Sequence, residues 1–355
     1  MDSTPSKSVP NGKYRHLAVS FLPHVPLLLL GLGILYRGYW LLLPALFLLV
    51  VVPLLDTLTG WQDDVAFEKS DFSRIDTSLF NWNTRLFAIL YLAAVIFVVK
   101  LTQRLTPLET AFASLSLSLL GGIAFAAAHE LLHGKEAIDQ ILQRILTTVL
   151  FYPHYKMIHI QSHHAHAATD HDKNTAWLNE SIYRYLLRTI PESMIRCWQM
   201  EAARRPGILR NKMFAFAIGQ IAFLAGLYFF AGAQGVLFYA GQLVGAHIVL
   251  ESVNYIQHYG LMREQHDGEY EKTGAEHSWD TYHYFSSHAT FRVGHHSYHH
   301  ISVKPYYLLA PEPKAPKLPV GYFWAIPMVF LPFFWRRVIN RKLHVEELSS
   351  ATSAA

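Results

Sequence analysis

Histidines are concentrated in three short segments of this chain. The segments read HELLH (residues 129–133), HIQSHH (159–164) and HSYHH (296–300), and one further histidine stands in NYIQHYG (254–260). On a helix, side chains at positions i and i+4 lie one turn apart on the same face, so each segment can present two imidazoles to one ion. Because neutral imidazole is the commonest metal ligand among side chains, the spacing predicts a nitrogen-ligated metal site.

The four segments together supply more ligands than one ion needs. A tetrahedral zinc site takes four ligands, so a larger set predicts two metal ions. The residue types leave the metal open, because imidazole suits Zn, Cu, Fe and Ni. HExxH is also the motif of zinc proteases, with Glu130 as the base, and a membrane zinc protease is one alternative. The candidate ligands are His129, His133, His159, His163, His164, His258, His296, His299 and His300.

Six other histidines crowd the same part of the chain, and we interpret them as supporting or loop residues: His154, His166, His171, His283, His288 and His295. Two of them are rivals for ligand positions, namely His295 for His296 and His166 for His164. Ligating imidazoles usually donate their second N–H to a carboxylate or a carbonyl, which makes Glu130 and Asp172 candidate partners. A solvated carboxylate is the simpler interpretation of either residue.

The composition is typical of a chain that is largely dissolved in lipid. Of 355 residues, 52% are hydrophobic and 16% charged, with a mean hydropathy of +0.17, whereas soluble domains are about 25% charged. The net charge of +4 is scattered, so nucleic-acid binding has little support. The single cysteine, Cys197, excludes a disulfide framework, a zinc ribbon and a cysteine-ligated iron–sulfur centre.

Six apolar runs predict an all-α integral membrane protein with about six transmembrane helices, since a span needs about 20 apolar residues. Lysines and arginines are frequent between residues 129 and 212 and sparse in the opposite loops, which places both termini and a histidine-rich cap in the cytoplasm at the cell inner membrane. The apolar, proline-broken run 320–339 is expected to lie in the membrane interface, with a seventh span as the alternative. The six runs cover about residues 17–35, 40–55, 86–101, 108–128, 213–230 and 236–255.

We expect one domain over residues 1–355. Its first four spans fall within 17–128, a cytoplasmic segment with two histidine boxes covers 129–212, and the last two spans cover 213–257. The third box and the interfacial segment follow in 258–355, with His258 just past the sixth helix.

The order of the boxes, the apolar hairpins between them and the segment NYIQHYGL resemble the membrane-bound alkane monooxygenases, relatives of the membrane fatty-acid desaturases. The resemblance runs from PLLDTLTG (53–60) to APKLPVGY (315–322). It implies that the nine histidines hold two non-haem iron ions, which activate O₂. The chain departs from the family pattern at Leu132, Ile158, Gln257, His295 and Tyr298, none of which removes a matched histidine.

The resemblance implies hydroxylation of the terminal methyl group of medium-chain n-alkanes to primary alcohols. Gln257 and the run LESVNYIQHYGLMRE (250–264) are similar to the xylene monooxygenase branch, so methyl groups of alkylbenzenes are the alternative substrate, and Gln257 is a candidate support of the metal site. A lipid desaturase or hydroxylase is a weaker alternative. A metal transporter is disfavoured, because its histidines should line the interior of the spans.

Electrons must come from another protein, because the chain has neither a nucleotide fingerprint nor a cysteine cluster. The implied partners are rubredoxin or ferredoxin with an NAD(P)H-dependent reductase. Arg204, Arg205, Arg292 and Lys304 are candidate contacts for an acidic carrier, with lipid headgroups as the alternative. The small residues GGIAFAAA (121–128) either make room for a hydrocarbon or let helices pack closely.

Overall fold

The computed structural model describes the backbone of residues 9–61 and 66–353, and the side chains of 12–61 and 66–343. The described chain is mostly helical. Its N-terminal half contains α1 (Val9–Val19), α2 (His24–Tyr36), η1 (Gly38–Leu42), α3 (Leu43–Leu46), η2 (Phe47–Val51), α4 (Val52–Thr59), η3 (Lys69–Asp71), α5 (Arg74–Leu101), η4 (Thr102–Arg104), α6 (Pro107–His133) and α7 (Ala137–Val149).

The remaining elements run from the second histidine box to the C-terminus. They are α8 (Tyr155–Ile158), η5 (His159–His163), α9 (His164–His166), α10 (Ile182–Arg204), η6 (Ile208–Arg210), α11 (Lys212–His258), β1 (Gln265–His266), β2 (Glu269–Tyr270), η7 (Ala275–His277), α12 (Tyr284–Ala289), α13 (His296–Ile301), η8 (Tyr306–Leu308), α14 (Tyr322–Val329) and α15 (Pro332–Ser353).

Five helical stretches of the described chain are long and apolar enough to cross a membrane. They are Gly12–Tyr36, Gly38–Thr59, Arg74–Arg104, Pro107–His133 and Lys212–His258. The first four correspond to the first four predicted runs, although the third begins well before residue 86. Its start is set by a capping box, in which the Ser73 side chain accepts from the backbone N–H of Asp76 and the Asp76 side chain accepts from that of Ser73.

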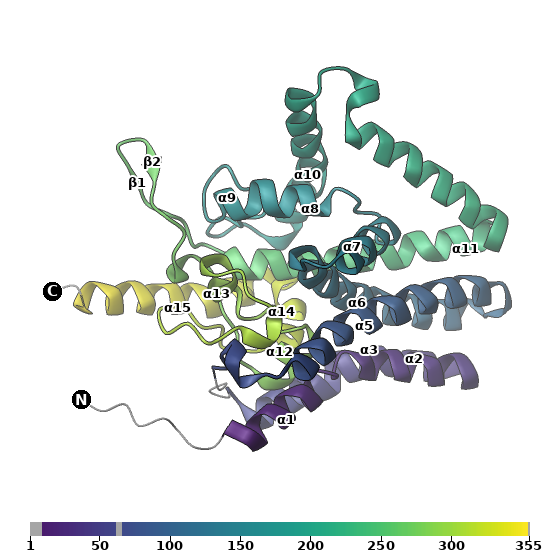
Figure 1. Ribbon diagram of the computed structural model, residues 1–355, viewed down its shortest axis with the longest axis horizontal. Coiled ribbons are helices and arrows are strands. Elements are labelled where there is room, and N and C mark those ends of the chain that lie inside the picture. Colours follow the sequence, from purple (N-terminus) through teal and green to yellow (C-terminus); the bar gives the residue numbers. More distant parts are fainter. Residues whose placement is uncertain (1–8, 62–65, 354–355) are drawn as a thin grey trace.

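The fifth stretch, α11, contains both of the last two predicted runs (213–230 and 236–255) as two helical arms. Gly232 interrupts it with φ 68° and ψ −173°, in the left-handed region that glycine tolerates. Figure 1 shows α11 as two diverging arms, of which the second runs back towards α13. Six crossings therefore stay a prediction, because the two arms of α11 count as one of the five stretches that meet the length and composition criteria. His258 is the last residue of α11, not a loop residue beyond it.

Helices α6 and α11 meet through glycines. A Cβ built on Gly121 would lie 2.5 Å from the Cβ of Ala246, and one on Gly122 would lie 2.2 Å from Cγ1 of Val249. Such contacts leave no room for a methyl group, so both glycines let the two helices pack closely, although Gly122 also lines a cavity. The close approach fixes the histidines at the C-terminal ends of these two helices relative to each other.

One element departs from the all-α prediction. Strands β1 and β2 pair antiparallel, with Gln265 opposite Tyr270 and His266 opposite Glu269. The two turn residues, Asp267 and Gly268, both have positive φ (51° and 87°), as a two-residue hairpin turn requires. Figure 1 shows this hairpin projecting from the end of the molecule where α13 and α15 lie.

The C-terminal apolar run is divided between α14 and the start of α15, and neither is among the spanning candidates. Its side chains are partly enclosed by protein: Tyr322 and Val329 of α14 and Trp335 and Ile339 of α15 are fully buried. The prediction that this run lies in the membrane interface remains a prediction.

Candidate metal centre

The nine predicted ligands converge into two groups. In each group, one ligand atom per residue lies within 4.8 Å of all the others. The five-histidine group contains both histidines of the first box and takes one or two from each of the other boxes. The four-histidine group contains the single histidine that ends α11. The first group is His129, His133, His159, His164 and His299, and the second is His163, His258, His296 and His300.

Local helix geometry distributes the boxes between the groups. His129 and His133 form the last turn of α6 and share a face at i, i+4 spacing. The second box begins with a stretch of π-helix, η5, a rare form that is frequent at functional sites. This wider turn places His159 and His164 in one group and His163 in the other.

The third box lies on α13, whose start is held by a buried carboxylate. Oδ1 of Asp280 accepts from the backbone N–H of Ser297 at 2.8 Å, and Oδ2 accepts from the Ser297 hydroxyl at 2.6 Å. Burial raises the pKa of Asp280 to about 6. Sequence analysis missed this residue, because no local pattern links it to a helix that begins 16 residues later.

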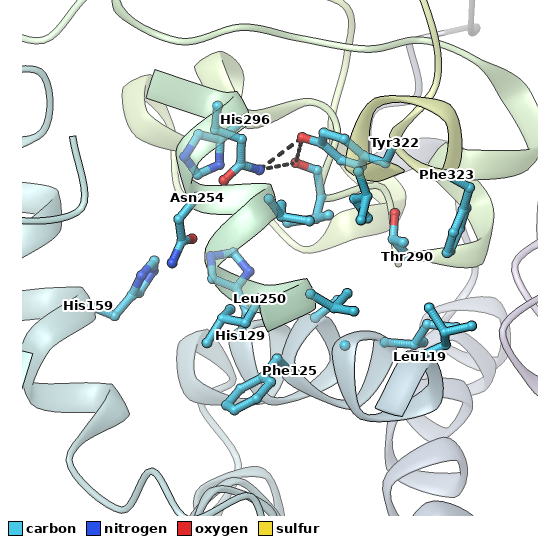
Figure 2. A pocket seen from close by; sticks show the side chains of 18 of the residues that line it. Leu119, Phe125, His129, His159, Leu250, Asn254, Thr290, His296, Tyr322 and Phe323 are labelled. Carbon is cyan, nitrogen blue, oxygen red and sulfur yellow. Dashed lines mark hydrogen bonds between the residues drawn. The ribbon is translucent and has the colours of Figure 1, made fainter. Parts of the chain in front are cut away.

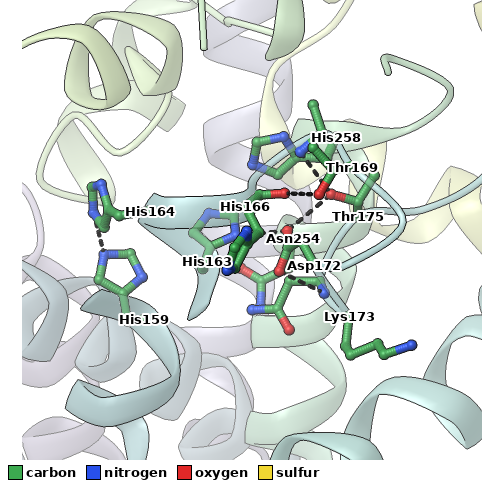
Figure 3. A network of polar contacts seen from close by, with 12 residues as sticks. His159, His163, His164, His166, Thr169, Asp172, Lys173, Thr175, Asn254 and His258 are labelled. Atoms are coloured by element: carbon green, nitrogen blue, oxygen red, sulfur yellow. Dashed lines mark hydrogen bonds and ion pairs between the residues drawn. The ribbon is translucent and has the colours of Figure 1, made fainter. Parts of the chain in front are cut away.

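Two candidate ligand histidines are oriented through their second nitrogen. Nδ1 of His163 donates to Oδ2 of Asp172 at 3.0 Å, and Nδ1 of His258 donates to the carbonyl oxygen of His277 at 3.1 Å. Figure 3 shows Asp172 beside His163 and Thr175, whose hydroxyl donates to Asp172 at 2.8 Å. Each contact fixes the proton on Nδ1 and turns Nε2 towards the group, as a ligating imidazole requires.

Asp172 is ionised in this environment. Burial alone would raise its pKa, but the neighbouring His163 imidazole and the hydrogen bonds from His163 and Thr175 outweigh burial and hold the pKa below its ordinary value. Asp172 is therefore placed as the sequence predicted, against a candidate ligand.

Ring nitrogens within a group lie close together, and a cation bound between them would account for this arrangement. Nε2 of His258 lies 3.0 Å from Nε2 of His296, which lies 3.0 Å from Nε2 of His300. Since His258 carries its proton on Nδ1, its Nε2 lone pair points at another ring nitrogen. Metal–nitrogen bonds of about 2.0–2.1 Å place neighbouring ligand atoms about 3 Å apart. The donor set and its spacing fit a metal ion in each group.

The imidazoles are also kept neutral. Burial, the largest cause, and repulsion from neighbouring rings lower the pKa of His164 to about 3. Both effects hold the pKa of four further ligands well below the ordinary range, so their nitrogens are free to bind metal at neutral pH. These four are His159, His296, His299 and His300.

Glu130 and Gln257 do not contact a ligand imidazole through any hydrogen bond found in the described chain. Oε1 of Glu130 accepts from the backbone N–H of Tyr306 at 3.1 Å, which ties α6 to η8. Nε2 of Gln257 donates to the Tyr322 hydroxyl at 2.9 Å and to the Val293 carbonyl at 3.2 Å. Gln257 thus holds the segment that leads into the third box.

The rival ligands fall outside both groups. His166 stacks edge-on against His171 with ring centroids 5.8 Å apart, and His295 lies 3.0 Å from Nη2 of Arg292 through Nε2. Arg292 is 1% exposed, so the prediction that it contacts an electron carrier is wrong. The chain reverses at Phe291 and Arg292, both with positive φ (50° and 54°), which turns the Arg292 side chain inwards.

A narrow cavity of about 50 Å³ reaches the metal centre from the apolar helices. Figure 2 shows it extending from Leu119 and Phe323 to His129, His159 and His296. Leu119 and His129 are ten residues apart on α6, so the cavity follows about 15 Å of that helix. Its apolar walls include Leu119, Gly122, Ile123, Ala126, Val249 and Val253.

Comparison with known proteins agrees with this geometry. The fatty acid desaturase family matches residues 106–311, which contain all nine histidines. The alkane 1-monooxygenase of Ectopseudomonas oleovorans is 31% identical over 97% of this chain and 88% of its own length. Alkane 1-monooxygenase 1 of Pseudomonas aeruginosa is 31% identical over 64% of this chain, and the match spans 61% of that relative.

A relative from the aromatic branch is also similar. The hydroxylase component of the xylene/toluene monooxygenase of Pseudomonas putida is 26% identical over 66% of this chain and 64% of its own length. The apolar helices and the histidine clusters mark the chain as a metal-binding membrane protein. By sequence and by the geometry of its histidines, the chain belongs to the fatty acid desaturase family, in the branch of the membrane-bound alkane and xylene monooxygenases.

Proposed function

We propose that the protein hydroxylates the terminal methyl group of medium-chain n-alkanes to primary alcohols, with two irons held by the nine histidines. The convergence of those histidines into groups of five and four carries the proposal. The bound irons would supply the activation of O₂, of which one atom enters the alcohol and the other leaves as water. The protein's own residues hold the imidazoles neutral, orient them and shape the approach of the substrate.

The cavity favours an unbranched chain over an aromatic ring. It is about 50 Å³ in volume yet extends along α6 from Leu119 to His129, so it is long and narrow. Pockets that hold small molecules usually measure about 300–1,000 Å³, so substrate entry requires the lining side chains to move apart. A chain needs less widening than a ring, and its leading methyl group would arrive first at the histidines.

The relatives support the same choice. The alkane 1-monooxygenase of Ectopseudomonas oleovorans matches almost the whole chain, whereas the xylene/toluene enzyme matches two thirds of it at lower identity. Two electrons and two protons are consumed in each turnover. We infer that rubredoxin or ferredoxin delivers the electrons from an NAD(P)H-dependent reductase at the cytoplasmic face of the inner membrane. Arg204, Arg205 and Lys304 are exposed and available to an acidic carrier.

Whole-cell product analysis tests the proposal. Cells that express the protein with a rubredoxin and its reductase would receive octane and p-xylene side by side under ¹⁸O₂. Labelled 1-octanol is expected as the main product. Labelled methylbenzyl alcohol as the main product would assign the protein to the aromatic alternative, and no label in either alcohol despite bound iron would refute hydroxylation of these substrates.

A matched pair of histidine variants serves as the control. His258→Ala removes a member of the four-histidine group and should abolish labelled product. His266→Ala changes an exposed histidine of the hairpin and should leave product formation unchanged. If the purified protein contained zinc and no iron, the iron assignment would be wrong.

A further inference from the structure

A second and larger cavity lies on the other side of α11. It measures about 380 Å³, which is within the range of small-molecule pockets. Tyr239, Leu243, His247 and Glu251 of the second arm line it at i, i+4 spacing, so they form one stripe of the helix. Residues Val249 and Val253 belong to the narrow cavity, on another face of the same helix.

The mouth of this second cavity is apolar. Its rim includes Phe151, Ile190 and Met194 of the segments beside α11, together with Val244. These four side chains are between 37% and 61% exposed. Figure 1 shows α10 and the two arms of α11 spreading apart around this region. Exposed apolar side chains beside a candidate membrane-spanning helix, α11, suit an opening onto lipid, through which a hydrocarbon tail can pass.

The floor of the cavity is polar and buried. His154, Ser193 and Glu251 are at most 4% exposed, and all three line the cavity. Nε2 of His154 is buried and has no hydrogen-bond partner among the described residues. Oε2 of Glu251 accepts from Nδ2 of Asn254 at 3.2 Å and from the Tyr185 hydroxyl at 3.4 Å. A buried polar atom without a partner is unfavourable, so a polar group of a ligand would be stabilised here.

We propose that this cavity binds a medium-chain primary alcohol, with the alkyl chain towards the mouth and the hydroxyl group between His154 and Glu251. A hydroxyl group both donates and accepts, so it can pair with the carboxylate and with the imidazole at once. The inference rests on the proposed function, because such an alcohol is the product of that reaction. Asn254 lines the narrow cavity and donates to Glu251, so the two cavities meet at one hydrogen-bonded pair.

The same floor discriminates against related molecules. An alkane would leave Nε2 of His154 without a partner. A fatty acid would carry a carboxylate charge into a buried site that no Lys or Arg among the described residues lines, and an unpaired buried charge is strongly unfavourable. The site should therefore prefer the alcohol to both the alkane and the acid of the same chain length. Leaving a buried polar atom such as Nε2 of His154 without a partner costs about a factor of ten in affinity.

Photo-crosslinking tests this inference on the iron-loaded protein in phosphatidylcholine nanodiscs. The probe would be a medium-chain primary alcohol with a diazirine at the end opposite the hydroxyl, and labelled peptides would be mapped by mass spectrometry. Label is expected at Met194, Leu224 and Val244. Competition by 1-octanol should be about tenfold stronger than by octane or octanoate. Label elsewhere, or equal competition by octane, would overturn the inference, since the cavity would then accept any alkyl chain, including lipid tails.

Three variants sharpen the result. Val244→Trp narrows the mouth at an exposed position that tolerates the larger side chain, and His154→Phe removes the floor partner. Each should reduce labelling about tenfold or more while iron content stays unchanged. Leu237→Trp is the matched control, because Leu237 is exposed two turns earlier on the same arm and does not line the cavity. Unchanged labelling in Val244→Trp would contradict the proposed site.

Octane hydroxylation, measured separately, distinguishes the two proposals. Alcohol bound in the cavity of a protein that does not hydroxylate octane would support the site and refute the proposed function. Labelled octanol formed by a protein whose cavity takes no probe would refute the site and leave the function standing.

Discussion

Replacing Asp172 by Asn should weaken the four-histidine group selectively. The Asp172 carboxylate accepts from Nδ1 of His163 at 3.0 Å, from the Thr175 hydroxyl at 2.8 Å and from the backbone N–H of Asn174 at 3.1 Å. An amide presents an NH₂ group on one side, so at least one of these donors loses its acceptor in either orientation. The charge that holds the His163 imidazole in place is lost as well.

The size of the effect follows from these contacts. A hydrogen bond to a charged group contributes about 1.5–3 kcal/mol, and 1.4 kcal/mol corresponds to a factor of ten. Loss of an outer partner of a ligating histidine typically lowers metal affinity about 10–100-fold. We therefore expect metal binding to the four-histidine group to weaken by about one to two orders of magnitude, while the five-histidine group keeps its affinity.

Iron titration against a competing chelator, with bound iron counted by mass spectrometry, measures this loss. Asp170→Asn is the matched control, because Asp170 is exposed, lies two residues away and undergoes the same change of charge. Wild-type affinity at both groups in Asp172→Asn, or an equal loss in Asp170→Asn, would refute the assignment of His163 as a ligand oriented by Asp172.

Three further predictions follow from the geometry. His164→Ala should lower the iron content whereas His166→Ala should not, because only the first belongs to a group; the reverse result would exchange the two assignments. Gly121→Ala should lower the free energy of unfolding by about 1–3 kcal/mol, because the new Cβ would lie 2.5 Å from a Cβ of the facing helix. Gly241→Ala is the control: a Cβ there has its nearest neighbouring atom at 3.7 Å, so the unfolding midpoint should stay unchanged. Equal midpoints for both glycine variants would contradict this account of the interface. Burial, the largest cause, lowers the pKa of His154 to about 4, below the value of about 6.5 expected in the unfolded chain. The unfolded state therefore binds more protons between pH 6.5 and 4, so the free energy of unfolding should decrease as the pH is lowered through this range, by up to about 1.4 kcal/mol per pH unit for this group. Denaturant titrations at several pH values should show a smaller decrease in His154→Gln than in the wild type. The same pH dependence in both proteins would exclude the contribution of His154.

The candidate ligands could be predicted from sequence because their signal is local. His129 and His133 share a helix face by spacing alone, and the number of imidazoles already exceeds what one zinc ion takes. The apolar runs could also be predicted from the sequence, since a membrane span needs a minimum length of apolar residues. The bend at Gly232 was harder to predict, because glycine in an apolar run is compatible with a straight helix, a kink or a loop.

The residues that hold the histidine segments in place do so through contacts between segments that are distant in sequence. Asp56 illustrates this, since its Oδ1 accepts from the backbone N–H groups of Phe285 and Ser286 at 2.8 and 3.2 Å, more than 200 residues along the chain. Asp280 at the start of α13 and the carbonyl of His277 behind His258 are further cases. A carboxylate in a loop looks the same in sequence whether it is solvated or caps a remote helix, so these roles could not be predicted.

By itself, the sequence identified the candidate metal ligands, indicated that the chain is helical and apolar enough for a membrane, and excluded a cysteine-ligated site, so that any metal must be held by nitrogen and oxygen. Residue type and periodicity carry this information, because they act over one or two helical turns. The tertiary structure alone decided that the second and third boxes each divide between two groups, that Arg292 is buried, and that α11 separates a narrow cavity from a wide one. These features depend on how far apart α6, α11 and α13 pack, and packing distances are set by side chains that are remote in sequence.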